Sequence, residues 1–207
     1  MATLLPSGPV CPVHHFPNYG SLTGFLFVFH PHNGTMKRIL VIGCAGSGKS
    51  TLSRRLRDIL HLPLIYLDQI WHLPDGSHIS PEEFDEQLAE VLDSPCWILD
   101  GNYRRTLPIR LEYCDTVILL DFPTEVCLKQ AAGRIGRKRE DLPWVETEFD
   151  PEFQDWIRHF RKRNLPEILD MLEEYRESRS IYVLHSHQET EDFIQTLKQI
   201  QRFSLTR

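Results

Sequence analysis

The chain has 207 residues, 41% of them hydrophobic, which is enough to bury one good core and too few for two comfortable domains. The formal net charge of −6 argues against a protein whose main activity is to coat nucleic acid. The five cysteines, an odd number without C-x-x-C spacing, favour a reducing compartment, so we expect a cytoplasmic protein.

Residues 1–35 differ in composition from the rest and are expected to form a largely disordered N-terminal extension. They are rich in proline and histidine and contain no lysine or arginine. Their apolar stretch, residues 25–29, is far too short to span a bilayer, so no membrane partner is expected. The histidines of this segment are better explained as solvated side chains than as metal ligands. Met36 directly precedes the first predicted strand and is the expected functional start.

The first predicted strand, residues 39–42, runs directly into a phosphate-loop pattern. The residues that fit G-x-x-x-x-G-K-[ST] are Gly43, Cys44, Ala45, Gly46, Ser47, Gly48, Lys49 and Ser50. The glycines let the chain wrap tightly, so that successive backbone N–H groups point at phosphate oxygens. The helix that begins near Gly48 adds its positive end to the same place. We therefore predict that this loop, together with Thr51, binds ATP.

Two side chains of the loop have predicted roles of their own. Lys49 is expected to reach the β- and γ-phosphates as a point charge, and the hydroxyl of Ser50 to ligate a Mg²⁺ ion that bridges them. The competing interpretation is a glycine-rich turn that binds nothing. It is disfavoured because strand, loop, lysine, hydroxyl and amphipathic helix occur in the required order.

From residue 36 onward, apolar runs of strand length alternate with helical patterns, which predicts a parallel sheet with helices on both faces. The remaining strands are predicted at residues 64–67, 97–100, 116–120 and 181–184. The helical patterns follow the phosphate loop, start at Pro81, cover 124–132 and 165–172, and end the chain near 193–200. Residues 36–207 are therefore expected to form a single domain.

Three aspartates end predicted strands, at the edge of the sheet where ligands bind in such folds. They are Asp68, Asp100 and Asp121. A carboxylate after an apolar strand is the usual partner of a phosphate loop, because it holds water ligands of the metal. Asp100 and Asp121 both fit this pattern, and each also fits a helix cap. We favour Asp100 for the metal because of the residues that follow it.

Several short motifs resemble those of adenylate kinase and its relatives. They are the phosphate loop, Leu99-Asp100-Gly101 with Arg104, Leu120-Asp121-Phe122-Pro123, and Gly133-Arg134. They occur in the family's order and at similar spacing, over about residues 36–199. The run Asp100-Gly101-Asn102-Tyr103 and a tryptophan-rich charged segment most closely resemble the DNA topology modulation proteins, which are kinase-like. The resemblance implies a three-layer P-loop NTPase fold with a five-stranded parallel sheet and a short lid, at about residues 134–163.

The same resemblance implies roles for individual residues. Asp100 would act on the metal, Arg104 would grip the phosphate or other anion of an acceptor, and Arg134 would belong to the mobile lid. Asp68 occupies the place where related small-molecule kinases hold the acceptor hydroxyl, which it would orient or deprotonate. A plain turn aspartate is the equal alternative. Gln130 stands where the family usually has an arginine stacked on the ATP base, so that contact is not predicted.

Two basic clusters lie in the predicted lid. They are Arg134, Arg137, Lys138 and Arg139, and then Arg158, Arg161, Lys162 and Arg163. Lid arginines supply positive charge where phosphoryl transfer spreads negative charge, and they help to exclude water. Most of these eight are expected to be solvated charges on a helix face. Arg134 is the favoured exception, followed by Arg158 and Arg161.

These patterns favour an enzyme that transfers the γ-phosphoryl group of Mg-ATP to an unidentified small acceptor, which could be a nucleotide. A sugar or metabolite kinase on the same scaffold differs only in its acceptor pocket. The alternative from another class is a regulatory ATPase that acts through DNA or a protein partner. The acidic composition and Arg104 favour the kinase, and direct DNA binding is not expected.

Overall fold

The computed structural model of the chain describes residues 36–204, so the expectations for residues 1–35 lie outside the described part. It contains a five-stranded parallel sheet in the order β2-β3-β1-β4-β5. The strands are β1 (Arg38–Gly43), β2 (Leu64–Tyr66), β3 (Trp97–Asp100), β4 (Thr116–Leu120) and β5 (Ser180–Leu184). The predicted fold class is confirmed. β4 is buried along its whole length, as expected for an apolar run covered on both faces.

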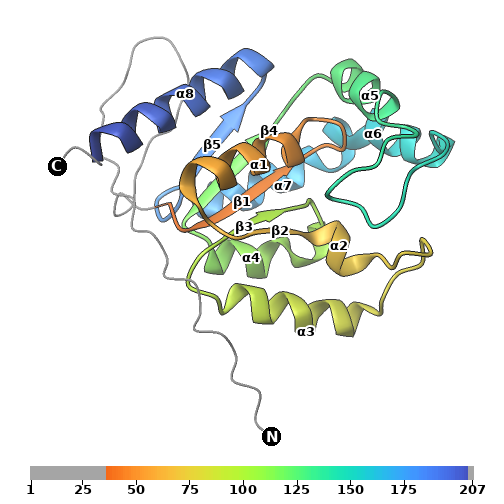
Figure 1. Ribbon diagram of the computed structural model, residues 1–207, viewed down its shortest axis with the longest axis horizontal. Coiled ribbons are helices and arrows are strands. Elements are labelled where there is room, and N and C mark those ends of the chain that lie inside the picture. The colour runs from red at the N-terminus through yellow and green to blue at the C-terminus, as the bar shows by residue number, and fades with distance from the viewer. Residues whose placement is uncertain (1–35, 205–207) are drawn as a thin grey trace, which may run out of the picture.

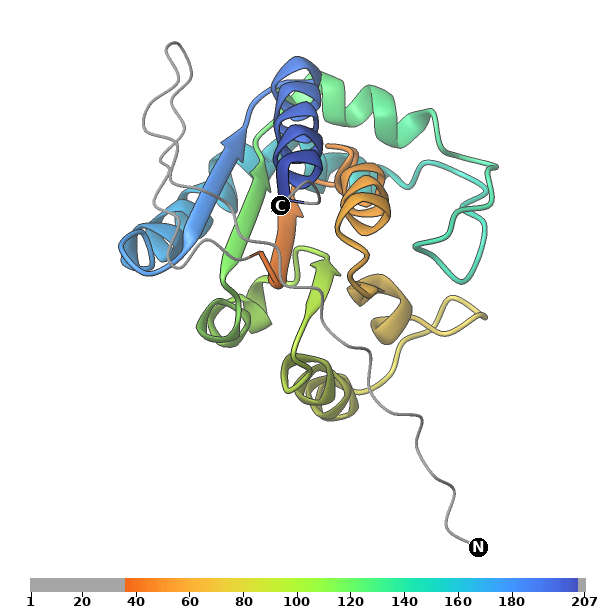
Figure 2. The same ribbon diagram turned by 60° about the vertical axis from the view of Figure 1, so that its left-hand side comes forward.

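Helices cover both faces of the sheet, which makes three layers (Figures 1 and 2). One face carries α1 (Lys49–Leu60) and α8 (His187–Ser204). The other carries α3 (Pro81–Leu92), α4 (Leu107–Tyr113) and α7 (Leu165–Glu174). The shorter α2 (Leu67–Trp71) follows β2, and η1 (Arg104–Thr106) precedes α4. No helix within 36–204 combines the length and apolar character needed to cross a membrane.

The strand order brings three chain segments to one edge of the sheet. β1 lies between β3 and β4, with Val41 opposite Asp100 and Gly43 opposite Leu120. Because all strands are parallel, the phosphate loop after β1 and the carboxylates after β3 and β4 leave the sheet on the same side. This arrangement is the reason that residues more than fifty positions apart share one site.

Two boundaries differ from the prediction. β2 ends at Tyr66, and Leu67 begins α2, so Asp68 lies in the first turn of a short helix instead of at a strand end. The predicted lid is only partly irregular: α5 (Thr124–Ala132) is followed by turns and loops up to residue 150, and then by α6 (Pro151–Arg163). α6 is fixed by Ile157 and Phe160, which are fully buried in the core.

The loop is packed too tightly against α5 to accept a side chain at Gly46. Gly46 has φ +78°, and a Cβ there would lie 2.1 Å from the carbonyl oxygen of Cys127. We expect Gly46→Ala to lower the free energy of unfolding by at least about 1–3 kcal/mol, because left-handed strain adds to the collision. Gly133→Ala is the control, since its Cβ has ordinary contacts and its backbone is helical. Equal urea denaturation midpoints for the two variants would contradict this packing.

Candidate active site

The phosphate loop has the backbone geometry that its sequence predicts. Gly48 ends the loop with φ +96° and serves as the N-cap of α1, without any side-chain cap. The N–H of Ser47 donates to the carbonyl of Cys44 at 3.1 Å, which closes the curl. The amides at the start of α1 therefore have no capping side chain to satisfy them, and they are free to bind an anion.

The two functional side chains of the loop have protein partners in this structure. The ammonium group of Lys49 donates to the carbonyl oxygen of Cys44 at 3.0 Å. The hydroxyl of Ser50 donates to a carboxylate oxygen of Asp141 at 2.9 Å. Asp141 comes from the segment between α5 and α6, so this segment contacts the loop at the predicted metal ligand. Thr51 lines a separate, smaller crevice on the other side of the loop.

Asp100 ends β3 beneath the loop and is only 4% exposed. Its Oδ2 atom is buried and has no hydrogen-bond partner among the described residues. Burial raises the pKa of this carboxyl to about 7, against the opposing effects of Lys49 and Ser50. A buried carboxylate without a partner is costly, and a cation held beside it would remove that cost. Asp100 thus fits the predicted metal role.

The rival carboxylate, Asp121, is engaged elsewhere. It pairs with Arg161 and with His185, each at 3.3 Å, and it does not line the cavity in front of the loop. Within residues 36–204, no cluster of three or more His, Cys, Asp or Glu side chains has the geometry to hold a metal by itself.

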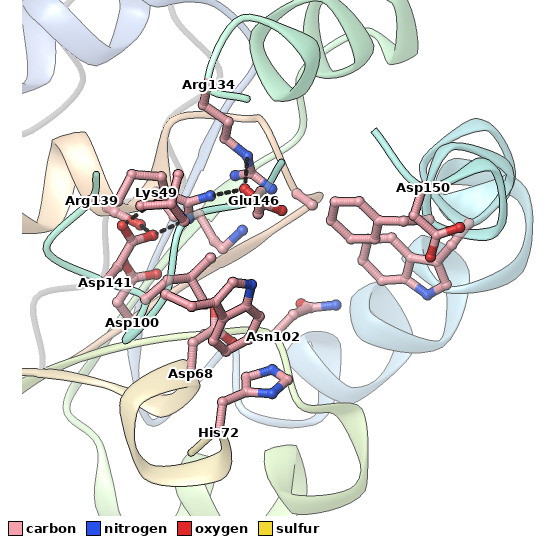
Figure 3. A pocket seen from close by; sticks show the side chains of 18 of the residues that line it. Lys49, Asp68, His72, Asp100, Asn102, Arg134, Arg139, Asp141, Glu146 and Asp150 are labelled. Carbon is pink, nitrogen blue, oxygen red and sulfur yellow. Dashed lines mark hydrogen bonds and ion pairs between the residues drawn. The ribbon is translucent and has the colours of Figure 1, made fainter. Parts of the chain in front are cut away.

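A cavity of about 710 Å³ opens in front of the loop and Asp100 (Figure 3). Its walls come from the loop, from α2, from residues 100–103 and from the stretch between α5 and the middle of α6. Lys49, Asp100 and Asp141 lie toward one side in Figure 3, Asp150 lies on the opposite side, and Asp68, Asn102 and His72 lie between them. The volume is within the range of small-molecule sites.

Arg134 points into this cavity, as the lid prediction requires. Its guanidinium group lies 3.4 Å from the carboxylate of Glu146 and 5.8 Å from the ring centre of Phe153. Burial lowers its pKa, and the nearby charge of Arg139 lowers it further. The Nε atom of Arg134 is buried and forms no hydrogen bond within the described part of the chain. The guanidinium group of Arg134 is therefore poorly solvated and still has a donor with which it could bind an anion.

Two cavity residues were missed by the sequence analysis. Arg139, expected to be a solvated charge, is largely buried and binds both Asp141 and Glu146. Asp141 in turn accepts the hydroxyl of Ser50. No local pattern distinguishes these residues, because they lie in a charged segment whose approach to the loop depends on the tertiary structure. Arg158 and Arg161 lie outside the cavity lining.

Asp68 lines the cavity and accepts a hydrogen bond from the hydroxyl of Tyr103 at 2.9 Å. The donor fixes the orientation of one carboxylate oxygen. Two neighbouring cavity residues have buried polar atoms without a hydrogen-bond partner in residues 36–204, the Oδ1 atom of Asn102 and the Nδ1 atom of His72. Burial lowers the pKa of His72, so this ring is neutral at pH 7. These three side chains form a neutral to acidic polar wall away from the loop.

Arg104 does not reach the cavity in this structure. It forms an ion pair with Glu167 at 2.5 Å, and its side chain is 47% exposed. The buried arginine of this region is Arg110, which the sequence analysis missed. It donates to the carbonyls of Gly101 (3.0 Å), Asn102 (2.8 Å), Tyr103 (2.8 Å) and Thr106 (3.3 Å). Its burial could have been predicted from its position between Leu107 and Leu111, which lie on the buried side of α4.

The smaller crevice behind the loop has a volume of about 190 Å³. Gln130 and His187 line it and are hydrogen-bonded to each other at 2.7 Å. The ring of His187 meets Phe122 edge-on at 4.8 Å. His187 therefore has two partners, Gln130 and Phe122. Gln130 occupies the position where the resemblance predicts an arginine.

Comparisons with known proteins identify no family for this chain: no protein-family model and no curated protein match it. Solved structures similar to it include a gluconokinase from Sinorhizobium meliloti 1021, with 16% identity over 80% of this chain and 91% of that one and a TM-score of 0.47. A shikimate kinase from Bacteroides thetaiotaomicron has 18% identity over 81% and 99% of the two chains, with a TM-score of 0.48. A sugar kinase from Janibacter sp. HTCC2649 has 22% identity over 78% and 91%, with a TM-score of 0.46.

At these identities and TM-scores the likeness concerns the fold alone, and the function has to be argued from the site. The resemblance to DNA topology modulation proteins stays a prediction.

Arg110 holds the wall of the cavity that carries Asn102 and Tyr103. We expect Arg110→Met to lower the free energy of unfolding by about 2–4 kcal/mol, because buried carbonyls lose their donors. The control is Arg104→Met, which breaks an exposed ion pair and should change stability by less than about 1 kcal/mol. Urea unfolding followed by circular dichroism measures both. A larger loss for the Arg104 variant would contradict the assignment.

Proposed function

We propose that this protein is an Mg-ATP-dependent phosphotransferase that acts on a hydroxyl group of a small acceptor. The observation that supports it most strongly is the single cavity in which the loop residues Lys49 and Ser50, the buried Asp100 and the oriented Asp68 all take part. This cavity, with Arg134 and Arg139 in its wall, argues against the alternative that the loop is a turn without a ligand.

The nucleotide would bind with its phosphates in the curl of the loop. The free amides at the start of α1 and the ammonium group of Lys49 hold the phosphate oxygens. Lys49 gives up its contact with the Cys44 carbonyl when a stronger acceptor arrives. The crevice lined by Gln130 and His187 lies on the far side of the loop and offers a place for the base.

Ser50 and Asp100 are the residues that would hold the magnesium ion. A bound ion would supply positive charge that offsets the negative charge of the phosphates. To bind it, the Ser50 hydroxyl would give up its hydrogen bond to Asp141. In the nucleotide-free form, Asp141 accepts the hydrogen bond of the Ser50 hydroxyl.

Arg134 and Arg139 would stabilise the transferred group. Both project from the segment between α5 and α6 into the cavity, and both are now bound to Glu146. Negative charge spreads over the three equatorial oxygens of a transferring phosphoryl group, and positioned cations lower the energy of that state. The γ-phosphate competes with Glu146 for these two arginines.

The acceptor would bind against Asp68. Its hydroxyl oxygen attacks the γ-phosphorus, the bond between that phosphorus and the β–γ bridging oxygen breaks, and ADP leaves. The proton of the hydroxyl passes to the carboxylate of Asp68, whose orientation the Tyr103 hydroxyl fixes. Arg104, which the resemblance assigns to an acceptor anion, would have to leave Glu167 to take part.

Lys49→Ala should weaken the binding of Mg-ATP at least 100-fold, because a positioned cation at the phosphates is lost. Isothermal titration calorimetry measures the affinity, and thermal unfolding shows whether the variant folds. Lys129→Ala, which removes an exposed lysine of α5, is the matched control and should bind like the wild type. If both variants bind equally well, the loop does not hold the triphosphate in the proposed way.

Asp68→Asn should reduce kcat by about 100-fold or more while Mg-ATP affinity changes little, because general bases contribute at least that much. The asparagine oxygen can still accept the Tyr103 hydrogen bond, so the fold is preserved. Tyr103→Phe leaves the base but frees its orientation and should lose less. ADP release with and without an acceptor measures these effects. Hydrolysis that no acceptor accelerates would favour the regulatory ATPase instead.

A further inference from the structure

We infer that the acceptor is a ring compound with a free hydroxyl and no negative charge, such as a neutral sugar, cyclitol or nucleoside, or an amine-bearing counterpart. This inference rests on the proposed transfer reaction and names the substrate class of the same cavity. It departs from the sequence-based expectation of an acceptor anion gripped by Arg104. Three features of the cavity lead to it.

The first feature is the balance of charge in the cavity wall. The acidic side chains outnumber the basic ones by six to three. The acidic ones are Asp68, Asp100, Asp141, Glu146, Glu148 and Asp150, and the basic ones are Lys49, Arg134 and Arg139. Bound Mg-ATP would add further negative charge. An anionic acceptor would therefore enter a field that repels it.

The second feature is the distribution of the cations. Lys49 contacts the loop, and Arg134 and Arg139 share Glu146, so all three belong to the end of the cavity that would receive the γ-phosphate. Toward the other end, Figure 3 shows Asp68, His72, Asn102 and Asp150, none of which is a cation at pH 7. Carboxylates and phosphates are usually bound by arginine or lysine, and no such side chain is present among the described residues of this wall.

The three arginines that follow β3 outside the cavity already have partners. Arg104 is paired with Glu167, and Arg105 makes a two-pronged contact with Asp85 at 2.7 and 2.8 Å. Arg110 is fully buried on backbone carbonyls. None of the three lines the cavity. An acceptor anion would have to break one of these arrangements before it found a cation.

The third feature is the aromatic surface of the cavity, of which Phe153 also faces the guanidinium group of Arg134. Phe153 and Trp156 lie parallel, with ring centres 6.0 Å apart, and both line the cavity. Trp144 contributes another ring, which contacts His72 edge-on at 4.6 Å. Flat aromatic faces pack well against the apolar face of a sugar or a base. The partnerless atoms of Asn102 and His72 are positioned in the same wall and would bind hydroxyl or amine groups.

The test uses the full chain and pairs of acceptors that differ chiefly in charge. ADP release is measured with glucose, glucosamine, gluconate and glucose 6-phosphate, and with nucleosides against their monophosphates. Mg-ATP binding is measured by calorimetry on the same samples. The inference expects stimulation by an uncharged or amine-bearing member, with kcat/KM at least tenfold above that of its anionic partner. A better anionic partner would overturn the inference and leave the transfer reaction standing. If Mg-ATP binds but neither series stimulates ADP release, the proposed transfer fails, and the inference with it.

A double variant tests whether the acidic wall causes the discrimination. Glu148→Gln combined with Asp150→Asn removes two negative charges, and an asparagine at position 150 can still cap α6 as Asp150 does. The ratio of neutral to anionic kcat/KM should fall at least threefold. The control is Glu152→Gln, a carboxylate of the same helix outside the cavity, which should leave the ratio unchanged. An unchanged ratio in the double variant would contradict the electrostatic argument.

Discussion

The site depends on a buried carboxylate held next to the lysine of a phosphate loop. Asp100 is desolvated beneath the loop, one of its oxygens lacks a hydrogen bond, and the charge of Lys49 is the largest influence that favours its ionised form. Such an arrangement is unfavourable by itself, because a charge in a poorly solvated place needs a partner. In the proposed function, a metal ion with its phosphates would supply the partner that this carboxylate lacks among the described residues.

The charged segment between α5 and α6 forms part of that cavity wall and pairs with the side chains that would bind its ligands in the proposed function. Its Asp141 occupies the hydroxyl of Ser50, and its Glu146 occupies Arg134 and Arg139. Nucleotide binding would exchange these internal partners for metal and phosphate. Protein contacts of similar polarity keep the groups in place before the exchange, so little reorganisation remains for the moment of transfer.

Charge is unevenly distributed over the cavity wall. The three cations lie near the phosphate loop and are balanced there by Asp100, Asp141 and Glu146, whereas Asp68, Asn102 and a neutral His72 form another part of the wall without a cation. This distribution depends on residues outside the cavity. Arg110 donates hydrogen bonds to the carbonyls of residues 101–103, and Glu167 forms an ion pair with Arg104, which does not line the cavity. Residues outside the cavity thus determine which polar and charged groups line it.

The sequence by itself determined the parallel α/β sheet and the position of the phosphate loop, because apolar periodicity and loop glycines are local signals. The preference for Asp100 over Asp121 as the metal residue came from the residues that follow Asp100, and it stays a prediction. The sequence also placed Arg134 in the wall of the site. Only the tertiary structure decided that Arg139 and Asp141 join the cavity, that Arg110 is the buried arginine and that Arg104 is not in the wall. These outcomes depend on which charged side chains meet across elements that are distant in the chain. The sequence around a charged residue does not predict such partners.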